Sequence, residues 1–104
     1  MTYKIAGIHD FEGPYISCYS LKEESGVYLV LDLRADGYHM IAAGESLNTR
    51  QAVGDHGQKK CWEENREGTL HYAAWYGDET GRLKMLKVVT DYYEIPCLAR
   101  AGRQ

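Results

Sequence analysis

Two apolar runs separated by a short turn dominate the middle of this sequence. Residues 26–33 read Gly-Val-Tyr-Leu-Val-Leu-Asp-Leu, and residues 38–43 read Tyr-His-Met-Ile-Ala-Ala. Side chains of this β-branched, aromatic and apolar kind favour strands. The segment Ala35-Asp36-Gly37 between them carries an Asp-Gly pair, which is typical of tight hairpin turns. The pattern predicts an antiparallel hairpin, so we expect the chain to fold around a sheet.

A short helix is expected directly after the hairpin. Gly44 ends the second run, and Ser46 or Asn48 can cap a helix that continues through residues 50–53 toward His56.

Three further segments have recognisable patterns. Residues 14–21 predict a first strand or an irregular lead-in, and the aromatic run at residues 69–76 predicts a third strand of the motif region. Residues 79–93 carry apolar side chains at steps of three and four, which predicts an amphipathic helix. The order hairpin, helix, strand, helix indicates an α+β domain with a small antiparallel sheet and helices on its faces.

The length and charge of the chain narrow its class. A chain of 104 residues fits one domain, and we expect residues 1–104 to form a single unit. The net charge of −3 provides no global attraction for nucleic acid, so binding would need a local basic patch. No window approaches the roughly 18 apolar residues of a membrane span, and no long apolar leader opens the sequence. We therefore expect a soluble, cytoplasmic protein.

The cysteines do not follow a disulfide or zinc pattern. Cys18, Cys61 and Cys97 are odd in number and widely spaced, which favours reduced thiols. His56 and Cys61, joined by Cys97 or His71, could in principle form a zinc site. No pair has zinc-finger spacing, so we expect no bound zinc.

Several short motifs then appear in a fixed order along the chain. They are Gly26-Val27-Tyr28, Ala42-Ala43-Gly44, Gly44-Glu45-Ser46, His56, Cys61-Trp62, Arg82 and Tyr92-Tyr93-Glu94-Ile95-Pro96-Cys97. In the order and spacing of these motifs, residues 26–97 resemble the GIY-YIG endonucleases. The resemblance implies a small three-stranded antiparallel sheet flanked by helices.

The resemblance also implies a site. Members of the family cut phosphodiesters with one divalent metal held by a glutamate on the last helix, assisted by tyrosines, an arginine and often a histidine. Tyr28 and Gly44 match the family, and His56 stands where many members have a histidine. Each retained residue also has a structural interpretation: Tyr28 as a packed strand residue, Arg50 as a solvated helix residue and His56 as a helix-end residue.

Three other positions depart from the family. Ala42 replaces the second tyrosine, Ala52 stands at the arginine position with Arg50 two residues early, and Lys87 replaces the metal-binding glutamate. A methyl group cannot move a proton, and an ammonium cannot ligate Mg²⁺. Lys87 either extends to solvent or places its cation where the metal would be and binds phosphate there.

These observations predict a catalytically silent GIY-YIG-like domain, a pseudoenzyme that binds nucleic acid or a protein partner. Its vestigial groove would be lined by Tyr28, Gly44, Arg50, His56 and Lys87, without a resident metal. One alternative is a residual endonuclease that uses Mg²⁺, with Arg50 and a carboxylate from elsewhere rebuilding the site. Another is a protein-interaction module without a nucleic-acid role, for which an aromatic patch of Tyr72, Trp75 and Tyr76 would be the surface.

Overall fold

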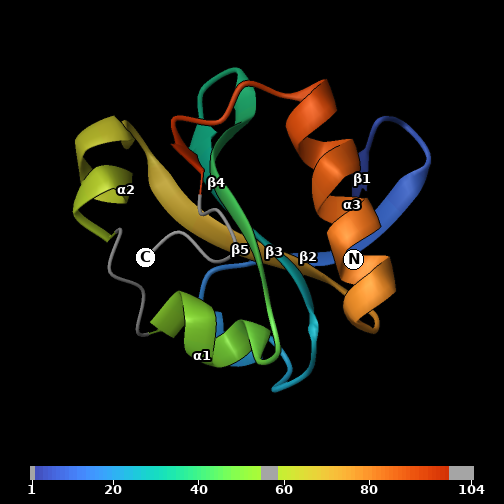
Figure 1. The fold of residues 1–104 in the computed structure, drawn as a ribbon. Coiled ribbons are helices and arrows are strands. Elements are labelled where there is room, and N and C mark those ends of the chain that lie inside the picture. Colours follow the sequence, from blue (N-terminus) through green and yellow to red (C-terminus); the bar gives the residue numbers. More distant parts are fainter. Residues whose placement is uncertain (1, 55–58, 99–104) are drawn as a thin grey trace.

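The computed structural model describes residues 2–54 and 59–98, and within them the chain forms one sheet with helices on both sides (Figure 1). The strands are β1 Thr2–Ile5, β2 His9–Tyr15, β3 Gly26–Arg34, β4 Gly37–Ser46, β5 Thr69–Tyr76 and β6 Cys97–Leu98. The helices are α1 Thr49–Gly54, α2 Lys59–Asn65 and α3 Glu79–Tyr92, with a 3₁₀ turn at Cys18–Ser20. The strand order is β1-β2-β5-β3-β4-β6, and β6 alone among these runs parallel to its neighbour.

The predicted hairpin is confirmed, because β3 and β4 pair antiparallel from Gly26 opposite Ser46 to Arg34 opposite Gly37. The predicted third strand of the motif region is β5, which pairs with the other side of β3. The helix expected at residues 79–93 is α3. Asp78 caps its first turn by accepting a hydrogen bond from the backbone N–H of Gly81.

The prediction of a small three-stranded antiparallel sheet is wrong, because the sheet that the described residues form has six strands and is mixed. Two of the additional strands precede the motif region. In β2 the strand pattern is interrupted by Gly13 and Pro14, and the pairing register with β5 shifts between Glu12 and Tyr15. Gly13 has φ +111, and a Cβ there would lie 2.7 Å from the carbonyl oxygen of Tyr72. The sequence pattern of β2 therefore does not predict a strand, and its pairing with β1 and β5 determines its conformation.

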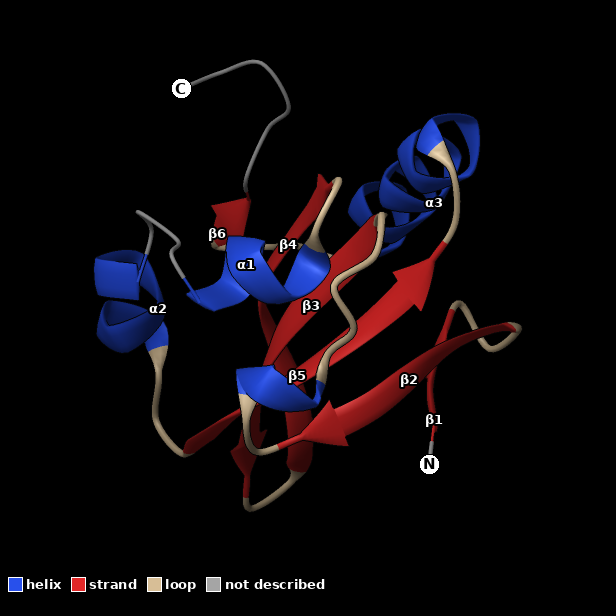
Figure 2. Cartoon of the chain, turned by 90° about the horizontal axis from the view of Figure 1, so that it is seen from below, coloured by secondary structure: helices blue, strands red, loops and turns tan. Residues whose placement is uncertain are grey.

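Side chains of the central strands alternate between the two faces of the sheet and form two core clusters, apart from a bulge in β4 where Ile41 and Ala42 both belong to the second cluster. The first core cluster comprises Ile5, Phe11, Val27, Leu29, Leu31, Met40, Ala43, Ala73, Met85 and Val89. The second comprises Leu21, Tyr28, Val30, Ile41, Ala42, Val53, Trp62, Ala74 and Cys97. Helix α3 contributes side chains to the first core cluster, and α1 and α2 contribute side chains to the second. Figure 2 shows α2 and α3 on opposite sides of the strands.

The expectation of three reduced thiols is wrong for two of them. Cys61 of α2 and Cys97 of β6 form a disulfide across 36 residues of sequence, with their Cα atoms 6.0 Å apart. Cys18 is a free cysteine. The fold brings the pair together from distant segments, which their spacing did not reveal. Disulfides are typical of oxidising compartments, so the cysteines do not support the predicted cytoplasmic location.

Within residues 2–54 and 59–98, no helix has the length and apolar character needed to cross a membrane.

Candidate functional site

Tyr28 lies in the middle of the sheet, and only 2% of it is exposed. On β3 it pairs with Gly44 of β4 on one side and with Ala74 of β5 on the other. The tyrosine ring covers Gly44, since a Cβ atom at that position would lie 2.6 Å from Cζ of Tyr28. Two small neighbours thus provide the space that the ring fills, and Gly44 is required by packing.

The surroundings of Tyr28 make its hydroxyl a poor base. Burial, and secondarily the negative charge of Glu45, raise the pKa of the hydroxyl well above its ordinary value. The group therefore stays protonated at neutral pH and cannot take a proton from water. Ala42, which replaces the second tyrosine, is 1% exposed and lies in the second core cluster. Its methyl group contributes to the core and to no chemistry.

Arg50 points toward the segment that precedes β3. Its Nε donates to the carbonyl oxygen of Leu21 at 2.9 Å, and its Nη1 donates to Glu23 at 3.2 Å. These bonds fasten α1 to the chain before β3. Ala52, at the arginine position, is partly buried against the second core cluster. His56 lies outside the residues that the structure describes.

Lys87 is not beside Tyr28. It lies on α3, which packs on the first core cluster, whereas Tyr28 belongs to the second. The Lys87 side chain is 75% exposed and pairs with Asp91 at 3.0 Å, one helical turn further along α3. The predicted groove with Lys87 as one wall is therefore not formed, because the sheet lies between Tyr28 and α3.

A buried polar network was missed. Arg82 of α3 forms an ion pair with Glu45 of β4 and donates from Nη1 to the hydroxyl of Ser25 at 2.9 Å. The side chains of Arg82 and Glu45 are only 11% and 10% exposed. A signal existed in the sequence, because Arg82 lies three residues before Met85 and seven before Val89, on the buried stripe of the helix. An arginine at such a position needs a carboxylate partner.

A hollow of about 440 Å³ lies elsewhere, along the outer edge of β4. We name it the edge slot. It is lined by Arg34, His39, Met40, Ile41, Asn65, Tyr93, Glu94, Ile95 and Pro96.

One wall of the edge slot is held by a network around Asp32. Asp32 is fully buried and accepts hydrogen bonds from the backbone N–H groups of Glu67 and Gly68 and from Nε of Arg34. Burial alone would raise the pKa of Asp32, but these hydrogen bonds outweigh it, so the pKa lies below its ordinary value. Arg34 in turn donates from Nη2 to the carbonyl oxygen of Asn65 at 3.1 Å.

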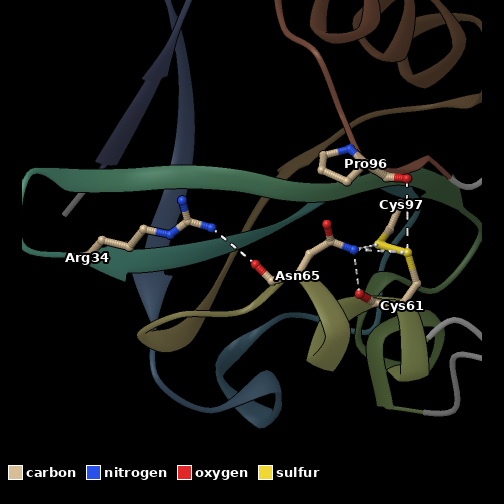
Figure 3. Close-up of a disulfide and its surroundings, with 5 residues drawn as sticks. All are labelled: Arg34, Cys61, Asn65, Pro96 and Cys97. Carbon is tan, nitrogen blue, oxygen red and sulfur yellow. Dashed lines mark hydrogen bonds between the residues drawn. A yellow bond between two sulfur atoms is a disulfide. The ribbon is translucent and has the colours of Figure 1, made fainter.

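Asn65 links this network to the disulfide. Its side-chain amide donates to the carbonyl oxygen of Cys61 at 2.9 Å and lies 3.6 Å from each sulfur of the Cys61–Cys97 bond. Figure 3 shows Asn65 between Arg34 and the two cysteines. The end of α2, the end of β3 and the start of β6 are thereby connected around one side of the edge slot.

The aromatic residues of β5 do not form one patch. Tyr72 and Tyr76 pack against the second core cluster and Trp75 packs against the first, because alternate residues of a strand face opposite ways. All three are partly buried. The surface suggested for a pure interaction module is therefore divided between the two faces of the sheet.

Among the described residues, no group of three or more His, Cys, Asp or Glu side chains is placed to hold a metal ion. Of the residues considered for zinc, Cys61 and Cys97 are joined to each other, and Nδ1 of His71 is 2.9 Å from the carbonyl oxygen of Thr69. Comparison of the chain with family models, with curated proteins and with solved structures found no match.

Proposed function

We propose that this chain is a catalytically silent GIY-YIG-like domain that acts by binding a protein partner. The observation that carries the silent assignment is that the sheet separates Tyr28 from Lys87, the position that the resemblance assigns to the metal-binding glutamate, so that residue 87 can bring no metal ligand to Tyr28. Ala42 and the buried, protonated Tyr28 support it, since neither can activate water.

The choice of a protein over nucleic acid follows from the charges. Most described cations are already compensated by carboxylates: ion pairs with Asp or Glu are formed by Lys4, Lys22, Arg34, Arg50, Arg66, Arg82 and Lys87. Phosphate binding needs cations that can replace the counterions of the nucleic acid. A chain of net charge −3 with paired cations is poorly suited to that task.

Two assays test the proposal. Purified protein is incubated with supercoiled plasmid and Mg²⁺ or Mn²⁺, with EDTA as the control, and we expect no nicking. Labelled DNA and RNA oligonucleotides are then titrated at low and high salt, and we expect no binding that weakens steeply with salt. Metal-dependent nicking abolished by Tyr28→Phe would establish the nuclease instead, and salt-sensitive binding would establish nucleic acid as the partner.

A further inference from the structure

A second hollow, of about 460 Å³, lies at the end of the sheet where β2 finishes and β4 and β5 begin. We name it the aromatic hollow. Its volume is within the range of pockets that bind small molecules. The end of β2 and the turn after it, the start of β4 and the start of β5 all contribute to its wall, which is lined by Pro14, Tyr15, Ile16, Ser17, Ser20, Tyr38 and His71.

The curvature of the sheet builds one side of the aromatic hollow. Tyr3 of β1 contacts Tyr38 of β4 with ring centroids 5.9 Å apart, although β2, β5 and β3 lie between these strands in the sheet order. The face of the first core cluster, on which both rings pack, is therefore concave here. The ring of Tyr38 also contacts the ring of His71 edge to face, with centroids 5.5 Å apart. Two ring contacts thus hold Tyr38 in place, and a preformed wall reduces the entropy that is lost when a ligand binds.

His71 provides a hydrogen-bond acceptor in this wall. The residue is only 7% exposed, and its Nδ1 is 2.9 Å from the carbonyl oxygen of Thr69. A carbonyl oxygen only accepts, so neutral His71 carries its hydrogen on Nδ1 and a lone pair on Nε2. Among residues 2–54 and 59–98, Nε2 has no hydrogen-bond partner, yet it is not sealed from solvent. A molecule in the aromatic hollow can therefore donate a hydrogen bond to Nε2.

The charge of the wall selects the kind of occupant. Among the described residues, none that lines the aromatic hollow carries a formal charge when His71 is neutral, in a chain in which 26% of the residues are charged. An ionic ligand would lose hydration there without gaining a partner of opposite charge. Tyr15 and Tyr38 offer aromatic surface, and Pro14 and Ile16 offer aliphatic surface. Such a wall favours a neutral molecule with a planar ring.

We propose that the aromatic hollow binds a neutral, planar aromatic small molecule that carries an N–H or O–H donor, as an indole or a phenol does. The donor binds Nε2 of His71, and the ring packs against Tyr15 and Tyr38. The site is separate from the partner-binding function proposed above and does not depend on it. A tryptophan side chain of another protein carries the same groups, so the test compares a free ligand with a peptide.

The test uses indole and 1-methylindole, which differ in the N–H donor. Backbone amide shifts of ¹⁵N-labelled protein are followed in mildly alkaline buffer, in which an ordinary imidazole is neutral. We expect indole to bind with a Kd of about 1 mM or tighter and to shift residues 14–20, 38 and 71 most. We expect 1-methylindole to bind about tenfold more weakly, because it leaves Nε2 unbonded. The ¹⁵N resonance of Nε2 should move with indole and not with 1-methylindole.

Matched variants locate the site. Ile16→Ala removes part of the wall, and Ile8→Ala makes the same change in the turn between β1 and β2; the two side chains are equally exposed, at 73% and 74%. We expect the first to weaken indole binding by about threefold or more and the second to leave it unchanged. His71→Phe retains a ring without Nε2, so indole and 1-methylindole should then bind alike. Thermal unfolding shows whether each variant is folded, and the ligand pair tests the parent without any substitution.

Four results would overturn the inference. They are absence of indole binding at millimolar concentration, equal affinity of the parent for indole and 1-methylindole, shifts that avoid the residues of the aromatic hollow, and binding of acetyl-Gly-Trp-Gly-amide more than about tenfold tighter than that of indole. The last result would assign the hollow to a side chain of a partner protein. Plasmid nicking or salt-sensitive nucleic-acid binding would contradict the proposed function and leave this site as it is.

Discussion

The two faces of the sheet are covered in different ways. One face is covered by α3, a helix of 14 residues whose Met85 and Val89 enter the first core cluster. The other face is covered by α1 and α2, which have six and seven residues and contribute Val53 and Trp62. Short helices are marginal by themselves, so the second face depends on tertiary links.

Three tertiary links hold the α1 and α2 side. They are the Cys61–Cys97 disulfide, the hydrogen bonds of Arg50 to Leu21 and Glu23, and the Asp32 network that holds the segment before β5. The α3 side has a continuous apolar stripe and the buried Arg82–Glu45 pair. The face bearing most of the motif positions is therefore assembled by contacts between residues that are distant in sequence.

The largest expected effect is on the α3 side. Arg82→Ala leaves Glu45 buried without its cation, and we expect a loss of about 3–5 kcal/mol in the free energy of unfolding. Chemical denaturation measures it. The control is the double variant Glu45→Leu/Arg82→Met, which removes both charges and should lose less than Arg82→Ala. A loss below about 1 kcal/mol for Arg82→Ala would show that the pair is solvated and that the stripe alone holds α3.

Loss of the disulfide should be next in size. Cys61→Ala/Cys97→Ala removes the link between α2 and β6, and we expect the free energy of unfolding to fall by about 2–4 kcal/mol. Dithiothreitol should destabilise the parent by a similar amount and leave the double variant unchanged. Cys18→Ala is the control for cysteine replacement. Insensitivity of the parent to the reductant would mean that the second face is held without this bond.

Asp32 gives a prediction with a defined pH dependence. In Asp32→Asn one acceptor oxygen is replaced by an amide that faces N–H donors, and we expect a loss of about 1.5–3 kcal/mol at neutral pH. Because the pKa of Asp32 is lowered on folding, its charge stabilises the fold above the unfolded pKa and ceases to do so as pH falls through the folded pKa. The difference between parent and variant should therefore be constant above about pH 5 and shrink below about pH 4. Denaturation across this range measures it, and a difference independent of pH would assign the effect to packing.

The same contrast explains which parts of the fold could be predicted. The hairpin, β5 and α3 have local patterns that match their final environment, with alternating faces in the strands and a repeated stripe in the helix. Strands β2 and β6 were missed because β2 contains Gly13 and Pro14 and β6 has only two residues. Their pairing is decided by neighbours that are distant in sequence. The disulfide was missed for the same reason.

The candidate site, like the fold, was predicted correctly only where local pairing decides the position of a residue. Tyr28 and Gly44 are adjacent because hairpin register places them opposite each other. Lys87 was assigned to the groove by counting back from Pro96, but a count along the chain does not say which face of a helix a residue occupies. Lys87 lies two residues from both Met85 and Val89, and residues two apart on a helix point in nearly opposite directions.

A substitution at Gly44 tests how tightly the face of the sheet that carries Tyr28 and the second core cluster is packed; we call it the motif face. Gly44→Ala puts a methyl group against the ring of Tyr28, and we expect a loss of about 1–3 kcal/mol in the free energy of unfolding. Tyr28→Leu in the same chain removes the obstructing ring end, so the double variant should lose less than the sum of the two single losses. Additive losses would mean that the ring does not lie over Gly44 in solution.

The smallest effect is expected from Lys87→Glu, and it decides whether the two faces are separate. Lys87 and Asp91 are 75% and 64% exposed, so their pair contributes little, and we expect the substitution to change the free energy of unfolding by less than about 0.5 kcal/mol. It should also produce no tight Mg²⁺ affinity in calorimetry, because the new carboxylate and Asp91 are two exposed groups on one turn of α3 and receive no ligand from the Tyr28 face on the far side of the sheet. Lys84→Glu, on the same exposed helix surface, is the matched control and should behave alike. If Lys87→Glu binds Mg²⁺ tightly and Lys84→Glu does not, residue 87 shares a site with the face that carries Tyr28. That result would contradict the separation of α3 from Tyr28 by the sheet.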